Sequence, residues 1–176
     1  MRKTQYHNFA ALKYAAVSVA IAGLFVIEAS ANTFYLVRHA EKQANGTDPA
    51  LTQCGTARAQ ALAAYLADIK LEAVYATPYL RTQQTAAAVA TQQQLTVSGY
   101  DPRDNAALLV QLKRHSGPVL IVGHSNTVPQ IVEQLSTFAM AALSEQDYSM
   151  LYRVDTAGAT PVVTLHRQAF SCESSG

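Results

Sequence analysis

Charge is scarce in this sequence, and its scarcity excludes several kinds of protein. Charged residues make up 14% of the 176 residues and the formal net charge is +1, so the chain lacks the basic footprint of a nucleic-acid-binding protein. No block of like charges marks an acidic or basic tail. No group of histidine, cysteine and carboxylate residues has the usual spacing of a metal site. We therefore expect no nucleic-acid partner, no metal and no other cofactor.

Long hydrophobic runs are also absent. The N-terminal run Ala15–Ile27 is shorter than the roughly 20 apolar residues that a membrane-spanning helix needs. Basic residues precede this run, and Ala29-Ser30-Ala31, a small-x-small cleavage pattern, follows it. These features are typical of a secretory signal peptide. We expect cleavage after Ala31, which removes residues 1–31 and leaves residues 32–176 as one periplasmic or secreted domain with no stable membrane anchor.

The sequence has two cysteines, Cys54 and Cys172. In an oxidising compartment they can form a disulfide, and closing so long a loop stabilises by about 4–5 kcal/mol in the chain-entropy view. Two independent thiols are equally compatible with the sequence, because nothing in it fixes the distance between them.

Strand-like and helix-like segments alternate along the chain. Short apolar runs predict strands, and capping residues followed by helical spacing predict helices. The predicted strands are 33–37, 73–77, 95–97, 119–122, 148–155 and 162–168, and the predicted helices are 52–66, 80–91, 103–114 and 128–135. This alternation favours an α/β fold: a three-layer, doubly wound, mostly parallel sheet with helices on both faces and a C-terminal antiparallel hairpin.

Cationic and imidazole side chains stand where three of these strands end. Arg38 and His39 follow the first strand, Arg81 follows the second soon after, and His124 follows the strand 119–122. Ligands of open α/β sheets bind in the crevice outside the carboxyl ends of the strands. Arginine binds two phosphoryl oxygens at once, and an imidazole can attack phosphorus to form a covalent intermediate. The four side chains therefore predict a site for a phosphoryl group.

Four segments resemble the histidine phosphatase superfamily, also called the phosphoglycerate mutase-like family. In chain order they are Val37-Arg38-His39-Ala40-Glu41, Leu51-Thr52-Gln53-Cys54-Gly55, the segment 76–86 and Val122-Gly123-His124. The resemblance implies that His39 is the nucleophile and that Arg38, Arg81 and His124 form the phosphate pocket of an enzyme that works without a metal. Ala40 stands where glycine is usual, and Ser125-Asn126-Thr127 follow His124 in place of glycines.

The resemblance also implies a carboxylic acid between the second arginine and the second histidine that protonates the leaving group. The sequence offers Asp101 and Asp104 there, and we predict Asp101. Asp101 can instead be a turn residue before Pro102, Asp104 can be a helix N-terminal acid, and some relatives lack such an acid altogether.

For contacts with the rest of the substrate we predict Asn45, Ser125 and Asn126, although Asn45 before Gly46 is also ordinary turn chemistry.

These inferences lead to one functional prediction and two alternatives. The prediction is an exported phosphomonoesterase that hydrolyses small-molecule or glycan phosphate esters through a phosphohistidine on His39. The alternatives are a phosphohistidine-protein phosphatase and a non-catalytic module that binds phosphorylated surface glycans.

Overall fold

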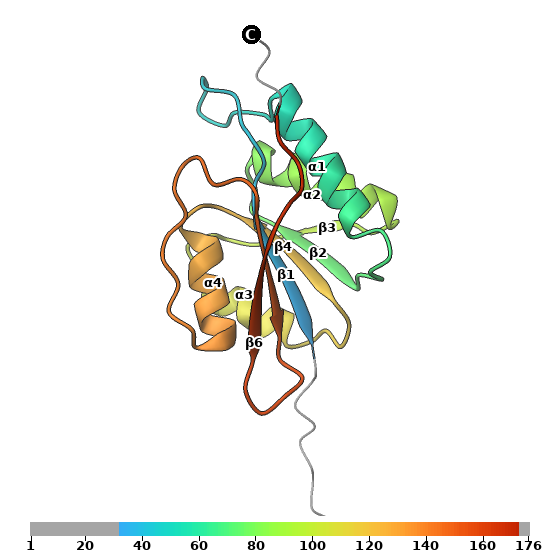
Figure 1. Ribbon diagram of the computed structural model, residues 1–176, viewed down its shortest axis with the longest axis vertical. Coiled ribbons are helices and arrows are strands. Elements are labelled where there is room, and N and C mark those ends of the chain that lie inside the picture. The colour runs from blue at the N-terminus through green and yellow to red at the C-terminus, as the bar shows by residue number, and fades with distance from the viewer. Residues whose placement is uncertain (1–31, 173–176) are drawn as a thin grey trace, which may run out of the picture.

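The computed structural model describes residues 32–172 (Figure 1). The predicted signal peptide and its cleavage site lie outside the described residues. Within the described part of the chain, no helix has both the length and the apolar character to cross a membrane.

A six-stranded sheet with the order β3-β2-β4-β1-β5-β6 forms the centre of the molecule. The strands are β1 (Thr33–Arg38), β2 (Ala73–Ala76), β3 (Val97–Gly99), β4 (Val119–Gly123), β5 (Met150–Asp155) and β6 (Val162–Arg167). Strands β1 to β4 are parallel to one another. Strand β5 runs antiparallel to β1, and β6 runs antiparallel to β5. The predicted mostly parallel sheet and C-terminal hairpin are confirmed.

Helices cover both faces of this sheet (Figure 1). The helices are α1 (Gln53–Tyr65), α2 (Leu80–Gln92), α3 (Asn105–Leu112) and α4 (Thr127–Ser136). Side chains of α1 and α2 share one core cluster with the sheet, and side chains of α3 and α4 share another. The molecule therefore has the predicted three layers.

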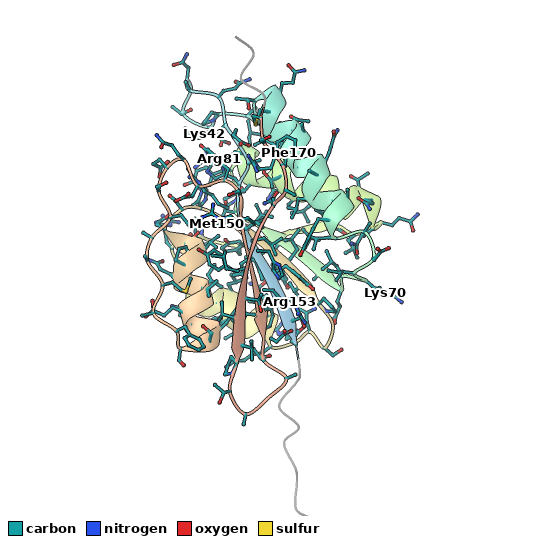
Figure 2. The ribbon with its side chains drawn as sticks, in the orientation of Figure 1. Lys42, Lys70, Arg81, Met150, Arg153 and Phe170 are labelled. Carbon is teal, nitrogen blue, oxygen red and sulfur yellow. A yellow bond between two sulfur atoms is a disulfide. The ribbon has the colours of Figure 1, made fainter. Side chains whose placement is uncertain are left out.

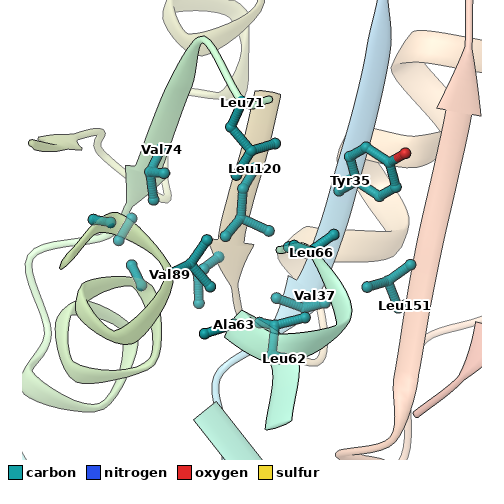
Figure 3. Packing of buried hydrophobic residues seen from close by; sticks show 14 residues of the cluster. Tyr35, Val37, Leu62, Ala63, Leu66, Leu71, Val74, Val89, Leu120 and Leu151 are labelled. Atoms are coloured by element: carbon teal, nitrogen blue, oxygen red, sulfur yellow. The ribbon is translucent and has the colours of Figure 1, made fainter. Parts of the chain in front are cut away.

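The central strand β1 supplies both clusters through its alternating side chains. Tyr35 and Val37 pack in the cluster under α1 and α2, which Figure 3 shows, while Phe34 and Leu36 pack in the cluster on the other face. A strand that is buried on both faces needs apolar residues at consecutive positions, and this accounts for the unbroken apolar run before Arg38.

Several predicted boundaries differ from the structure by one or two residues, among them the start of β5 at Met150 and not at residue 148. Two of these differences have a clear local cause. Strand β3 begins at Val97, two residues later than predicted, because Gln94 adopts a left-handed conformation (φ 57°) and Leu95 N–H still donates to Ala90 O at the end of α2. Helix α3 begins at Asn105 and not at residue 103, because the Asp104 side chain caps it by accepting from an α3 amide.

A disulfide joins Cys54, near the start of α1, to Cys172 at the C-terminal end of the described chain. The Cα atoms lie 5.6 Å apart across a sequence separation of 118 residues. Of the two alternatives left open by the sequence, the structure has the disulfide. The bond ties the segment after β6 to the start of α1.

Replacing both cysteines with serine is expected to lower the free energy of unfolding by about 4–5 kcal/mol, because the unfolded chain regains the entropy of a long open loop. Urea denaturation of the oxidised protein and of the double variant measures the difference. Reductant should lower the stability of the native protein toward that of the variant and leave the variant unchanged. Equal stability of the oxidised protein and the variant would contradict this expectation.

Candidate active site

The pairing of β1 with β4 brings the two histidine segments together. Arg38 at the end of β1 lies opposite Gly123 at the end of β4, and His39 N–H donates to Gly123 O at 2.9 Å. His124 follows directly, so that the two imidazole centroids are 5.5 Å apart. Arg81, in the first turn of α2, comes to the same end of the sheet from β2 (Figure 2).

These side chains line a cleft of about 360 Å³. The wall of the cleft contains four cationic residues and one carboxylate. This excess of positive charge favours an anionic ligand. The lining residues are Arg38, His39, Lys42, Tyr79, Arg81, Pro102, Arg103, His124, Ser125, Asn126, Thr127 and Glu145.

His39 is held as a neutral imidazole with a defined tautomer. Its Nδ1 lies 2.8 Å from the carbonyl oxygen of Ala40. A carbonyl oxygen can only accept, so Nδ1 carries the proton and Nε2 keeps a free electron pair. Burial, together with the charges of Arg38 and Arg81, lowers the pKa of His39 to about 3, although the hydrogen bond to Ala40 opposes this. The ring is therefore neutral at neutral pH, with an unprotonated Nε2.

His124 is also neutral in the ligand-free cleft. Burial and the charges of Arg81 and Arg38 lower its pKa to about 4. Its Nε2 is 3.0 Å from the hydroxyl oxygen of the buried Thr77, and its backbone N–H donates to Thr127 Oγ1 at the start of α4. These contacts fix the ring beside His39.

Two of the three arginines that line the cleft, Arg38 and Arg81, keep unused donors. Within the described residues, Nε of Arg38 and Nε of Arg81 are buried without a hydrogen-bond partner. The guanidinium carbon of Arg81 lies 4.5 Å from the centroid of the Tyr79 ring. Nη1 of Arg81 lies 3.5 Å from a carboxylate oxygen of Asp48. Buried donors without partners are costly, and an oxyanion in the cleft can satisfy them.

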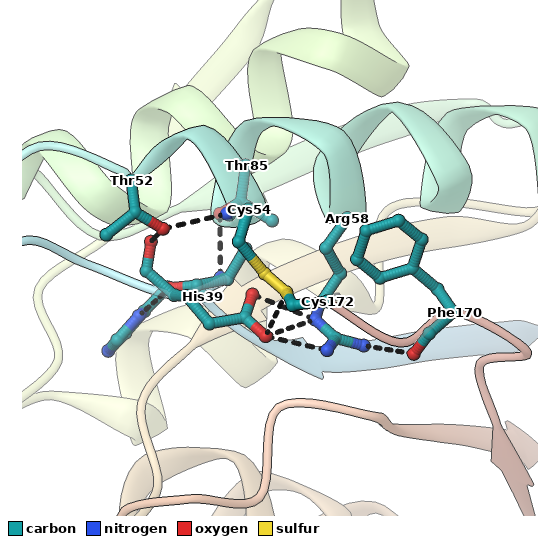
Figure 4. A network of polar contacts seen from close by, with 10 residues as sticks. His39, Thr52, Cys54, Arg58, Thr85, Phe170 and Cys172 are labelled. Carbon is teal, nitrogen blue, oxygen red and sulfur yellow. Dashed lines mark hydrogen bonds and ion pairs between the residues drawn. A yellow bond between two sulfur atoms is a disulfide. The ribbon is translucent and has the colours of Figure 1, made fainter. Parts of the chain in front are cut away.

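The loop after His39 is fixed by the starts of α1 and α2. Ala40 N–H donates to Thr85 Oγ1 at 3.0 Å, and Glu41 O accepts from Thr52 N–H at 2.9 Å (Figure 4). Gly55 touches this loop so closely that a methyl group there would overlap the carbonyl oxygen of Glu41. This close approach explains the glycine of the segment Leu51–Gly55, since no larger residue fits.

A second polar network joins the same loop to the C-terminal segment (Figure 4). The Glu41 carboxylate accepts two hydrogen bonds from Arg58 Nε and one from its Nη2, and Arg58 stacks on the Phe170 ring. Glu41, Cys54 and Cys172 form the one group of three possible metal ligands among the described residues. None of the three lines the cleft, and both sulfurs are bonded to each other.

The structure brings some predicted substrate contacts into the cleft and leaves others outside. Ser125 and Asn126 line it, whereas Asn45 lies in an exposed loop and is not part of its wall.

Asp101 does not line the cleft either. Its exposed carboxylate pairs with Arg103 at 2.9 Å, and the hydrogen bonds from Arg103 lower the pKa of Asp101. Because Asp101 lies outside the wall of the cleft, this placement does not favour the role predicted for it. Asp104 caps α3 and is also absent from the wall.

A larger cavity of about 550 Å³ lies between α1 and α2. Alanine, glutamine, threonine and one leucine line it, and it contains no titratable side chain. The predicted residues Arg38, His39, Arg81 and His124 all line the smaller cleft.

Comparison with known families supports the resemblance seen in the sequence. The sequence model of the histidine phosphatase superfamily (branch 1) matches residues 34–103, which include Arg38, His39 and Arg81. Over this part of the chain the protein is similar to the histidine phosphatase superfamily. No curated protein matches it by sequence.

Solved structures of phosphatases share the fold at low sequence identity. The protein histidine phosphatase SixA, complexed with tungstate, has a TM-score of 0.63 and 18% identity over 77% of this chain and 97% of SixA. A phosphohistidine phosphatase SixA from Nakamurella multipartitia has a TM-score of 0.63 and 22% identity over 81% and 99% of the two chains. Mycobacterial glucosyl-3-phosphoglycerate phosphatase has a TM-score of 0.65 and 12% identity over 80% and 100%.

Several residues in or next to this cleft were not predicted from the sequence. Thr77 and Tyr79 lie in a segment that carried the family resemblance, so a closer look at that segment could have found them. Glu145 lies in the irregular stretch between α4 and β5, where no motif or periodicity points to it. Tyr148 is the first residue of the predicted strand 148–155, but in the structure it precedes β5 and its contact with the site was not predicted. Arg38 contacts both, through its Nη2 at 2.8 Å from Glu145 and its guanidinium carbon 4.3 Å from the Tyr148 ring centroid.

Neither cleft imidazole should titrate between pH 8 and pH 5 in the ligand-free protein. With pKa values of about 3 for His39 and about 4 for His124, both rings stay neutral over this range. Histidine Cε1–H chemical shifts, recorded by NMR in phosphate-free buffer, measure this directly, and the variants His39→Asn and His124→Asn assign the two signals. A shift of either signal with a midpoint near pH 6.5 would contradict the expectation.

Proposed function

We propose that this protein is a histidine phosphatase, an exported, metal-independent phosphomonoesterase that hydrolyses small-molecule or glycan phosphate esters through a phosphohistidine on His39. The observation that carries the proposal is the state of His39: its Nδ1 donates to Ala40 O, so Nε2 offers a free electron pair to a cleft with two unsatisfied arginine donors. This combination suits attack on a bound phosphoryl group.

In the first step, Nε2 of His39 attacks phosphorus and the bond to the ester oxygen breaks. The transition state spreads negative charge over the phosphoryl oxygens. Arg38 and Arg81 stabilise these oxygens through donors that are already in place, a contribution worth about 3–4 kcal/mol per donor at comparable sites. The nearby negative charge raises the pKa of His124, which then adds a further donor.

In the second step, water attacks the phosphohistidine and releases inorganic phosphate. The Nδ1–H bond to Ala40 O keeps the imidazole in the same orientation throughout, so the neutral ring is an adequate leaving group and is restored for the next cycle. Nothing in this sequence of steps needs a metal ion.

Export is proposed from the N-terminal sequence, in which basic residues, the run Ala15–Ile27 and Ala29-Ser30-Ala31 follow one another. The disulfide between Cys54 and Cys172 supports the proposal, because such bonds persist in oxidising compartments such as the periplasm. We place the working enzyme in the periplasm or outside the cell.

A phosphohistidine in another protein is the second candidate substrate, since two of the similar structures are SixA phosphohistidine phosphatases. The third candidate function is that of a module that binds phosphorylated glycans without turnover. The same experiment separates the three.

Phosphate release from a panel of phosphomonoesters, with a metal chelator present throughout, tests the proposal. The native protein is expected to turn over several esters, His39→Ala to fall to background, and Arg81→Lys to lose roughly 10²–10³-fold in kcat because a single ammonium replaces a two-donor fork. Ser98→Ala, on the edge strand β3 and away from the cleft, is the control for general damage.

Other results would redirect the proposal. Turnover of a phosphohistidine peptide with none of the esters would favour the second candidate. Binding of phosphorylated glycans without any turnover would favour the third, and activity that disappears with the chelator would contradict metal independence.

A further inference from the structure

Glu145 projects a carboxylate into the cleft from the segment between α4 and β5. Its Oε2 accepts from Arg38 Nη2 at 2.8 Å, and its Oε1 accepts from Ser125 Oγ at 2.9 Å. Among the described residues that line the cleft, it is the one carboxylate. Asp101 and Asp104, which the sequence offers for the same chemistry, lie outside the cleft wall.

The backbone around Glu145 is fixed, whereas its side chain is mostly exposed to solvent. Leu143 N–H donates to Ser125 O at 3.1 Å, Ser144 O accepts from Arg38 Nη1 at 2.8 Å, and Ser144 N–H donates to Asp147 Oδ2 at 3.0 Å. The Glu145 side chain itself is 77% exposed. The carboxylate can therefore leave Arg38 without any movement of the chain that holds it beside the histidines.

A bound phosphoryl group changes the surroundings of this carboxylate. In the free protein, the hydrogen bond from Ser125 and the charge of Arg38 lower the pKa of Glu145, and the group is ionised. A phosphate ester dianion competes for Arg38 and adds negative charge next to Glu145. Loss of the ion pair and the like charge both favour the protonated acid.

We propose that Glu145 is the proton donor for the leaving group, a role that rests on the proposed function of the cleft. As His39 Nε2 bonds to phosphorus and the ester P–O bond breaks, the carboxylic acid gives its proton to the departing oxygen, which leaves as an alcohol. The resulting carboxylate then takes a proton from the water that attacks the phosphohistidine. Phosphate leaves, Arg38 pairs with Glu145 again, and Glu145 releases to solvent the proton that it took up from solvent when the substrate bound. Both Glu145 and His39 are then back in their starting states.

The dependence of rate on the leaving group tests this role. An alkyl phosphate such as glycerol phosphate expels a strongly basic alkoxide and needs the proton, whereas p-nitrophenyl phosphate expels a stable phenolate and does not. Glu145→Gln is expected to lower kcat on the alkyl ester by roughly 10²–10⁴-fold, the usual contribution of general acid catalysis, and on the aryl ester by less than about tenfold. Glu145→Asp should recover part of the alkyl activity.

Two carboxylates provide matched controls. Asp147→Asn removes a carboxylate that supports the same segment and does not line the cleft, so it should not change the ratio of the alkyl to the aryl rate. Asp101→Asn should likewise leave that ratio unchanged.

Three results would overturn the inference. An equal loss on both esters in Glu145→Gln would mean that Glu145 only orients Arg38. No loss on either ester, or a selective alkyl loss in Asp101→Asn and not in Glu145→Gln, would remove Glu145 from the proton transfer. These outcomes presuppose His39-dependent turnover of p-nitrophenyl phosphate by the native protein; without such turnover the proposed function itself fails, and the inference fails with it.

Discussion

The pairing of β1 with β4 is the constraint on which the rest of the site depends. Hydrogen bonds between these two parallel strands set Arg38 opposite Gly123 and join His39 to Gly123 O. Because both strands are buried on both faces, a shift in their register would force side chains of the wrong size and shape into two close-packed clusters. The relative position of His39 and His124 is therefore fixed by the energetics of the core, and the reacting groups need little adjustment when a ligand arrives.

The electrostatics of the cleft follow from the same burial. His39 is 3% exposed and the neighbouring Arg38 is 2% exposed. Burial and the charges of the guanidinium groups lower the pKa of both imidazoles, His39 and His124, so both rings stay neutral. A neutral nucleophile beside fixed cations is suited to an anionic electrophile, since the cations attract the phosphoryl group without protonating the attacking nitrogen. The starts of α1 and α2 hold the loop after His39 and keep this arrangement in place.

The sequence predicted the parts of the site that regular structure positions. His39, Arg81 and His124 stand just after parallel strands, whose carboxyl ends meet at one edge of a sheet, so their convergence follows from topology. The position of Asp101 depends instead on a local turn and on the neighbouring Arg103, and its role could not be judged from spacing. Glu145 was not predicted, because its segment has no periodicity and follows a path set by tertiary contacts. The shifted start of β3 has a similar cause, a left-handed residue that periodicity does not reveal.

Trapping the covalent intermediate is the most direct test of the account. Rapid quenching of the native protein with excess p-nitrophenyl phosphate, followed by mass spectrometry of its peptides, should find one phosphoryl group that is stable to alkali, labile to acid and located on His39. The variant His39→Asn should carry none. A phosphoryl group on His124 or on a hydroxyl side chain, or continued turnover by His39→Asn, would contradict the central claim that His39 is the nucleophile.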